Sequence, residues 1–230
     1  MSDYLHLEFF LENDGISYNG FMAFLIGTTN PAKFARYRTI LAEVGIRDVL
    51  SPREIGQLLP IVEDGQTAGE NARRKAVAYA QATGLPTLGI DEALYIPALP
   101  AGDQPGTNVR RYVGRTASDE ELLQAILAKI SPIPAGQRQA VWIYALCLAW
   151  PPGRDIAAEV TIEEMFTDQP YRPLRPGYPL SSLLYVPAIG KTLTQLTPAE
   201  EAHHLAPLYT QLKQLYDKFV SDECRVPSAE

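Results

Sequence analysis

The apolar positions near the start of the chain follow first a strand pattern and then a helix pattern. Residues 21–26 are all apolar, which predicts a buried strand, and residues 34–44 place apolar side chains at helical spacing. A short polar segment, Gly27 to Lys33, joins the two, with Pro31 at a position that the first turn of a helix tolerates. We therefore predict a strand, a tight turn and a helix in direct succession.

Similar patterns continue along the chain and alternate between strand and helix. They predict strand 4–11, helix 67–84, a short strand 87–90 that ends at Asp91 and Glu92, helix 118–129, an apolar strand 141–150, a weaker strand 159–166, strand 183–186, and a last helix from Thr197 that breaks at Pro207. Segments 97–106 and 170–179 are rich in proline or glycine and predict loops. Trp142 and Trp150 are interpreted as core and edge aromatics. The alternation indicates an α/β fold.

The polar turn is a candidate phosphate site. The first turn of a helix carries N–H groups without helical partners and the positive end of the helix dipole, and both favour an anion. Thr28, Thr29 and Asn30 add hydroxyl and amide groups there, and Lys33 adds a positive charge. The spacing differs from that of a P-loop. The alternative interpretation is a plain turn with a capping threonine and a surface lysine.

Composition and charge exclude some classes of protein. With 230 residues, 46% of them apolar, the chain is long enough for a large core in one domain or two lobes. A net charge of −7 argues against a general nucleic-acid or membrane-surface binder. No apolar stretch approaches the roughly 20 residues that span a bilayer, and the acidic N-terminus does not resemble a signal peptide. Cys147 and Cys224 are predicted to be reduced thiols, so we expect a cytoplasmic protein.

Five parts of the chain, in order, match the motifs of a known enzyme family. They are Thr28-Thr29-Asn30-Pro31-Ala32-Lys33, the acidic loop Glu63-Asp64-Gly65 with Glu70-Asn71-Ala72-Arg73-Arg74-Lys75-Ala76, the segment from Leu85 to Leu94, the segment from Pro105 to Tyr112, and Gly177-Tyr178-Pro179 with Gly190 to Leu196. On these motifs, the chain from about residue 22 to residue 220 resembles the inosine/xanthosine triphosphate pyrophosphatases, which hydrolyse deaminated purine nucleotides.

The resemblance implies a two-lobed α/β fold, with a long mixed central β-sheet flanked by helices and a cleft between the lobes. Residues 22–220 would form this single domain. Residues 1–21 would be an N-terminal extension with an extra strand, and residues 221–230 a flexible tail. Members of the family usually form homodimers, so the resemblance also implies a homodimer.

The resemblance further implies an activity and assigns residues to it. Family members cut a nucleoside triphosphate into a monophosphate and pyrophosphate with the help of Mg²⁺. By position, Glu63, Asp91 and Glu92 would bind the metal, and Asp91 and Lys33 would act in catalysis. The phosphate- and substrate-binding residues would be Thr28, Thr29, Asn30, Lys33, Lys75, Arg111 and Tyr178. Taken singly, Glu63 also fits a solvated loop carboxylate, and Lys75 a surface charge.

The chain departs from the family pattern in both halves of the expected site. Ile90 replaces one of two neighbouring aspartates, and Glu92 restores that acid only if the backbone turns there, because neighbours on a strand face opposite sides. At the base-reading end, Glu201 replaces a lysine and Leu205-Ala206-Pro207 replaces the triplet Ser-His-Arg. Two other functions therefore stay open: a nucleotide- or phosphate-binding protein with impaired catalysis, and a pyrophosphatase for another phosphoanhydride.

Overall fold

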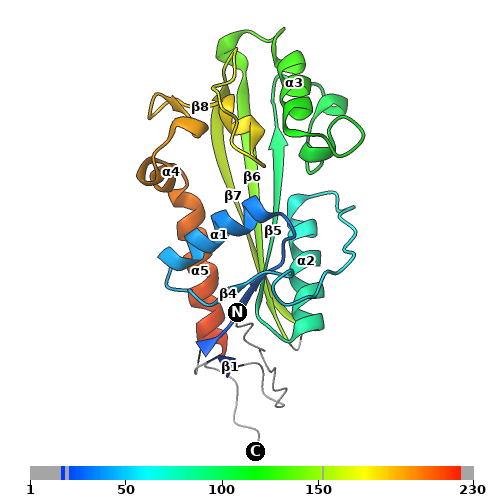
Figure 1. Cartoon of the computed structure of the whole chain (residues 1–230), viewed down its shortest axis with the longest axis vertical. Helices are drawn as coiled ribbons and strands as arrows, with labels where there is room; N and C mark the ends of the chain where they lie inside the picture. Colours follow the sequence, from blue (N-terminus) through cyan, green and yellow to red (C-terminus); the bar gives the residue numbers. More distant parts are fainter. Residues whose placement is uncertain (1–16, 19–20, 152, 224–230) are drawn as a thin grey trace, which may run out of the picture.

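A mixed β-sheet forms the centre of the molecule in this computed structural model, which describes residues 17–18, 21–151 and 153–223 (Figure 1). Its seven strands lie in the order β4 (Val49–Leu50), β3 (Phe24–Ile26), β5 (Thr87–Tyr95), β6 (Gln139–Trp150), β7 (Arg154–Phe166), β8 (Leu184–Val186) and β9 (Lys191–Thr192). Strand β3 runs parallel to β4 and β5, and the remaining neighbours are antiparallel. The predicted α/β class and mixed sheet are confirmed.

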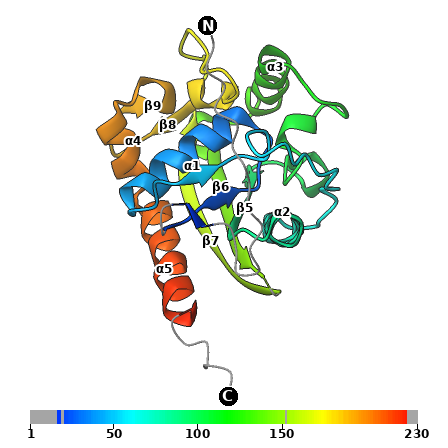
Figure 2. The ribbon, with the colours of Figure 1, turned by 60° about the horizontal axis from the view of Figure 1, so that its bottom comes forward.

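Helices cover both faces of this sheet. They are α1 (Pro31–Glu43), α2 (Ala68–Thr83), α3 (Asp119–Ile130), α4 (Pro198–His204) and α5 (Ala206–Glu223). Helix α2 packs on one face through alanines that meet small residues of β5 and β6, whereas α1 and α5 pack on the other face through larger apolar side chains. Figure 2 shows α2 and α5 on opposite sides of the strands. None of the described helices is long and apolar enough to span a bilayer.

Two separate cores give the molecule two lobes that share one sheet. The first lies around α1, α5 and the ends of β6 and β7 near Trp150, and the second lies around α3 and the segment from Pro179 to Ser182. Trp142 packs against both cores. Strands β5, β6 and β7 run through both lobes (Figure 1), so the two lobes are connected by continuous hydrogen-bonded strands.

Helix α2 lies unusually close to β5 because of one glycine. A Cβ atom at Gly89 would lie only 2.0 Å from the carbonyl oxygen of Ala72, so any larger residue would push the helix away. The helix starts at its cap Thr67, which accepts a hydrogen bond from the Glu70 N–H, and ends at Gly84, whose φ of 72° suits glycine. This fixed position sets where the side chains of α2 reach the strand.

Two predicted strand boundaries are wrong. The strand predicted at 87–90 continues to Tyr95, because its pairing with β6 is unbroken from Thr87 to Tyr95. Asp91 and Glu92 therefore lie in the middle of a strand and not at its end. The strand predicted at 159–166 begins at Arg154, and its start was missed because residues 154–158 are exposed or half-buried and lack the alternation that marks the rest of the strand.

The predictions for the two ends of the chain have mixed outcomes. Helix α5 continues to Glu223, so the flexible tail predicted from residue 221 begins too early; residues 224–230 lie outside the described part. The predicted strand 4–11 also lies outside it, as does most of the N-terminal extension. The described residues of that extension include Ser17–Tyr18 and the first residue of Phe21–Met22, two short strands that pair with each other. The break predicted at Pro207 is confirmed, with α4 ending at His204 and α5 starting at Ala206.

Candidate active site

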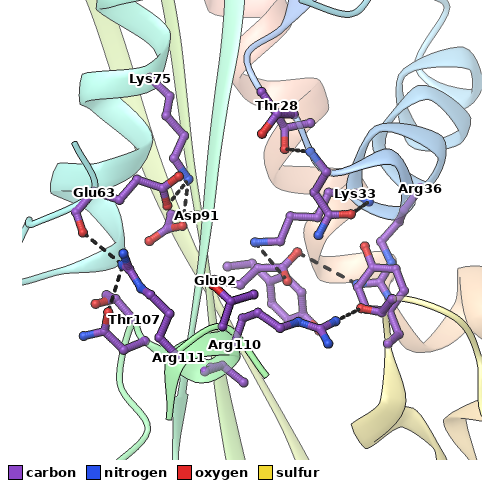
Figure 3. A pocket seen from close by; sticks show the side chains of 18 of the residues that line it. Thr28, Lys33, Arg36, Glu63, Lys75, Asp91, Glu92, Thr107, Arg110 and Arg111 are labelled. Atoms are coloured by element: carbon purple, nitrogen blue, oxygen red, sulfur yellow. Dashed lines mark hydrogen bonds and ion pairs between the residues drawn. The ribbon is translucent and has the colours of Figure 1, made fainter. Parts of the chain in front are cut away.

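A cavity of about 680 Å³ lies between the two lobes. It is lined by the turn after β3, by α1, by the loop before α2, by β5 and β6, and by the segments around Arg111 and Tyr178. All the residues that the sequence assigned to the site line this cavity: Thr28, Thr29, Asn30, Lys33, Glu63, Lys75, Asp91, Glu92, Arg111 and Tyr178. The cavity has two chemically different ends (Figure 3).

The strand–helix turn uses two of its polar side chains to cap α1. The Asn30 Oδ1 accepts hydrogen bonds from the N–H groups of Ala32 and Lys33 at 2.9 and 3.2 Å. The Thr28 Oγ1 accepts one from the Asn30 N–H at 3.2 Å. These oxygens therefore act as acceptors within the turn, which fits the plain-turn interpretation, while the Lys33 side chain reaches the cavity. Phosphate binding by this turn stays a prediction.

We call the first end of the cavity the metal end; Glu63, Lys75 and Asp91 line it, and the buried Asn71 contacts Asp91. The Lys75 Nζ lies 2.9 Å from the Asp91 Oδ1, 2.9 Å from the Glu63 Oε2 and 3.0 Å from the Ile90 carbonyl oxygen. Lys75 is only 7% exposed and is therefore no surface charge. Burial alone lowers the pKa of its ammonium group, but Asp91 and Glu63 outweigh burial and raise that pKa, so Lys75 stays protonated.

Asn71 positions this end and was missed as a site residue by the sequence analysis. Its Nδ2 donates to the Asp91 Oδ2 at 3.1 Å, and its Oδ1 accepts from the Gly65 N–H at 2.8 Å. The side chain thus joins the strand carboxylate to the loop that carries Glu63. A signal was present, because Asn71 and Lys75 are four residues apart and share one face of a helix.

The metal end supplies two oxygen donors for a hard cation. Mg²⁺ is usually bound by one or two carboxylates, with water and phosphate oxygens completing its shell. Glu63 and Asp91 fit this pattern, since both carboxylates already converge on one positive charge, the Lys75 ammonium group. Among the residues that the structure describes, no group of three or more histidine, cysteine or acidic side chains is close enough to hold a metal. Metal binding by Glu63 and Asp91 stays a prediction.

Glu92 leaves β5 on the side opposite to Asp91. The strand makes no turn at this point, so the condition for Glu92 to replace the missing acid of position 90 is not met. Its carboxylate lies 3.4 Å from the Lys33 Nζ and 3.9 Å from the Arg36 Nη1. The geometry therefore separates Glu92 from the predicted metal ligands, and we leave it out of the proposed ligand set.

The two neighbouring arginines of the Pro105–Tyr112 segment face different ends. Arg111 donates to the Glu63 carbonyl oxygen at 3.3 Å and to the Asn108 Oδ1 at 2.9 Å, which places it at the metal end. Arg110 forms an ion pair with Asp119 and donates to the Gly177 carbonyl oxygen at 2.9 Å. It thereby fixes the loop that carries Tyr178.

Comparison with known proteins places this chain in one family. The family model described as "Ham1 family" matches residues 24–206. The chain belongs to the Ham1 family. A relative named dITP/XTP pyrophosphatase from Halalkalibacterium halodurans is 33% identical and spans 85% of this chain and 97% of its own. A second protein of that name, from Thermus thermophilus, is 33% identical over 80% of this chain and 85% of its own.

Solved structures agree with this assignment. A HAM1 protein from Coxiella burnetii is 27% identical, with a TM-score of 0.70 over 86% of this chain and all of its own. The Ham1 protein of Staphylococcus aureus is 23% identical, with a TM-score of 0.69 over 85% of this chain and 98% of its own, and so supports the fold alone.

This Ham1 chain has a second cavity end that we call the aromatic end; it contains Arg36, Glu92, Trp142 and Tyr178. The Arg36 guanidinium lies 3.9 Å from the centre of the Tyr178 ring, a cation–π contact. Burial, followed by the negative charge of Glu92, raises the pKa of Tyr178 well above its ordinary value, so its hydroxyl keeps its proton.

The residues that replace the family's base-reading group are engaged elsewhere. Glu201 forms an ion pair with Arg175 at 2.8 Å and lies 4.0 Å from Arg36. Leu205 is buried in the core, and the His204 Nε2 lies 2.9 Å from the Glu164 Oε1. Helix α4, through Glu201, therefore contacts Arg36 at the aromatic end. Arg36 itself lies on α1, a helix that the sequence analysis had not connected with the base.

Proposed function

We propose that this Ham1 protein is a nucleoside triphosphate pyrophosphohydrolase that converts deaminated purine nucleotides, of the inosine and xanthosine type, into monophosphate and pyrophosphate. Relatives named dITP/XTP pyrophosphatase support the reaction and the substrate class. The observation that carries the proposal is the metal end, where two carboxylates from different segments converge on one buried lysine. This arrangement suits a reaction in which negative charge must be balanced on neighbouring phosphates.

The side chains of the cavity support separate roles in the hydrolysis. Water attacks the α-phosphorus, the bond from the α-phosphorus to the bridging oxygen breaks, and pyrophosphate leaves. Asp91 is held by Lys75 and Asn71, so one of its oxygens can orient the water or accept its proton. Lys33, Lys75 and Arg111 bind the phosphate oxygens. Glu63 and Asp91 would hold Mg²⁺, which would offset phosphate charge.

We also propose a cytoplasmic homodimer, with no nucleic-acid or membrane partner. The assembly follows from likeness to the family, and the absence of such partners from the net charge of −7. Cys147 is buried and free among the described residues, and burial raises its pKa to about 12, which suits a structural thiol. Sedimentation of the full chain at several concentrations tests the dimer.

The decisive experiment measures pyrophosphate release from ITP, XTP and the four common nucleoside triphosphates, with Mg²⁺ and with a chelator. We expect metal-dependent release that is fastest for ITP and XTP. Asp91→Asn should lower kcat by about 10²- to 10⁴-fold, the range for removing a general base. Asp217→Asn, an exposed carboxylate on α5, is the matched control and should change nothing.

One observation favours a second candidate, a nucleotide-binding protein with impaired catalysis. Ile90 stands where the family pattern has an aspartate and is fully buried in the core. ITP binding by calorimetry without any pyrophosphate release would support this candidate and overturn the first.

A further inference from the structure

Unpaired polar atoms gather at the aromatic end. Among the residues that the structure describes, six buried side-chain nitrogen and oxygen atoms have no hydrogen-bond partner. Four of them belong to residues that line the cavity: the Arg36 Nε, the Glu92 Oε1, the Trp142 Nε1 and the Tyr178 hydroxyl. Buried polar groups in native proteins are nearly always hydrogen-bonded, so such a cluster needs an explanation.

The residues that carry these four atoms line one cavity although they are far apart in the sequence. Arg36 comes from α1, Glu92 from β5, Trp142 from β6, and Tyr178 from the loop before Pro179–Ser182. Arg36 contacts both Tyr178, at 3.9 Å from the ring centre, and Glu92, at 3.9 Å from its Oε1. Trp142 is flanked by Tyr144, with ring centres 6.3 Å apart. Aromatic surface and unpaired hydrogen-bonding atoms therefore meet in one place.

We propose that Arg36, Glu92, Trp142 and Tyr178 read the base of the nucleotide and take over from the family residues that this chain lacks. The inference rests on the proposed function, because that function places the phosphates at the metal end and leaves the aromatic end for the base. A planar base that carries hydrogen-bonding groups at its edge matches both properties of this end.

The balance of donors and acceptors identifies the class of base. The Arg36 Nε–H and the Trp142 Nε1–H are donors and match carbonyl oxygens. The Glu92 Oε1 is an acceptor and matches a ring N–H. Hypoxanthine and xanthine present a carbonyl beside a ring N–H at the edge where adenine presents an amino group beside a bare ring nitrogen. The set therefore selects oxopurines, and unpaired groups would be left buried with adenine.

The sharpest test is Trp142→Phe, which removes a donor that has no partner in the described protein. Trp150→Phe is the matched control, because Trp150 lies on the same strand but in the core around α5. Inhibition by the two reaction products separates the ends of the cavity, since inosine monophosphate carries a base and pyrophosphate does not. We expect Trp142→Phe to weaken inhibition by inosine monophosphate about tenfold. Inhibition by pyrophosphate should stay within about twofold.

The melting temperature and a second variant distinguish base reading from a purely structural role of Trp142. Both tryptophan-to-phenylalanine changes remove the same packed atoms, so Trp142→Phe should lower the melting temperature no more than Trp150→Phe does, whereas the loss of a structural hydrogen bond would lower it further. Glu92→Gln keeps the size of the side chain and removes its charge. We expect kcat/KM for ITP to fall about 10- to 100-fold and that for ATP to fall less, so that the preference for ITP shrinks. Because Lys33 is then freed from Glu92, pyrophosphate inhibition should be unchanged or stronger.

The outcomes separate this inference from the proposed function. Equal weakening of both product inhibitors in Trp142→Phe, or of neither, overturns the base-reading assignment. If the unaltered protein releases no pyrophosphate from any nucleotide, the proposed function fails, and calorimetric titration with inosine monophosphate then decides the inference alone. Binding that Trp142→Phe weakens about tenfold supports it, and no binding to the unaltered protein overturns it.

Discussion

The two ends of the cavity differ in how completely their polar groups are paired. At the metal end, the Lys75 ammonium group meets two carboxylates and a carbonyl, and both oxygens of Asp91 accept hydrogen bonds. At the aromatic end, four buried atoms are unpaired among the described residues. A closed network keeps its geometry without a ligand, whereas unpaired atoms gain hydrogen bonds when a ligand arrives. The metal end therefore holds its own side chains in place, whereas the aromatic end discriminates between ligands by the hydrogen bonds that they supply.

The largest effect on this contrast should come from Gly89→Ala. The new methyl group would meet the Ala72 carbonyl oxygen and push α2 off β5, which would separate Lys75 and Asn71 from Asp91. We expect a loss of about 1–3 kcal/mol in the free energy of unfolding, typical of an overpacked core, together with loss of pyrophosphate release. Urea unfolding measures the first. Gly136→Ala, where the methyl group meets open space, is the control, and equal stability of the two variants would contradict the prediction.

A smaller effect, confined to the metal end, should follow Asn71→Ala. Asp91 and the Glu63 loop lose their common partner, so the affinity for Mg²⁺ should fall about 10- to 100-fold, as for other groups that orient metal ligands. Calorimetric titration with Mg²⁺ alone measures this, and the preference for ITP over ATP should not change. Gln81→Ala, on an exposed face of α2, is the control. Unchanged Mg²⁺ affinity would refute the positioning role.

The smallest effect concerns Glu164, whose Oε2 is also unpaired among the described atoms but does not line the cavity. Burial raises the pKa of this carboxyl, and His204 only partly opposes the rise. A raised pKa in the folded state means that stability is fully present below the ordinary value of 4.5 and is lost as pH rises through the folded value.

Glu164→Gln should therefore gain stability relative to the unaltered protein as pH increases from 4 to 8. A pKa raised by one corresponds to about 1.4 kcal/mol, so the melting temperature at pH 8 should be higher by about 3–5 °C for a pKa raised by that amount. Base preference should not change, which separates Glu164 from the aromatic end. Glu163→Gln, exposed on the other side of β7, should show no such trend. A pH-independent difference would contradict the prediction.

The sequence predicts most of the fold because its signals are local. Capping residues such as Thr67 and Ser118 marked helix starts, and the apolar run at 141–150 marked the central strand. The end of β5 was missed because Asp91 and Glu92 look like the polar end of a strand. Only the structure shows that Lys75 and Arg36 on two different helices offset their buried charges.

The candidate site divides in the same way. Residues of the metal end come from the loop, helix and strand between Glu63 and Asp91, so motifs that are close in sequence bring them together. Residues of the aromatic end come from positions 36, 92, 142 and 178, and no local pattern connects them. The sequence analysis interpreted Trp142 as an ordinary core or edge aromatic. Its unpaired N–H could not be foreseen, because it depends on long-range packing against both cores.

Asp91 and Glu92 are joined by a single peptide bond, and each serves a different end of the cavity. Substitutions in loops or helices can reshape either end, but the span between the two is set by covalent geometry and is the same in every variant that keeps β5. The strand therefore sets the distance between the two ends of the cavity. A ligand in which a longer or shorter spacer separates phosphate from base cannot engage both ends at once.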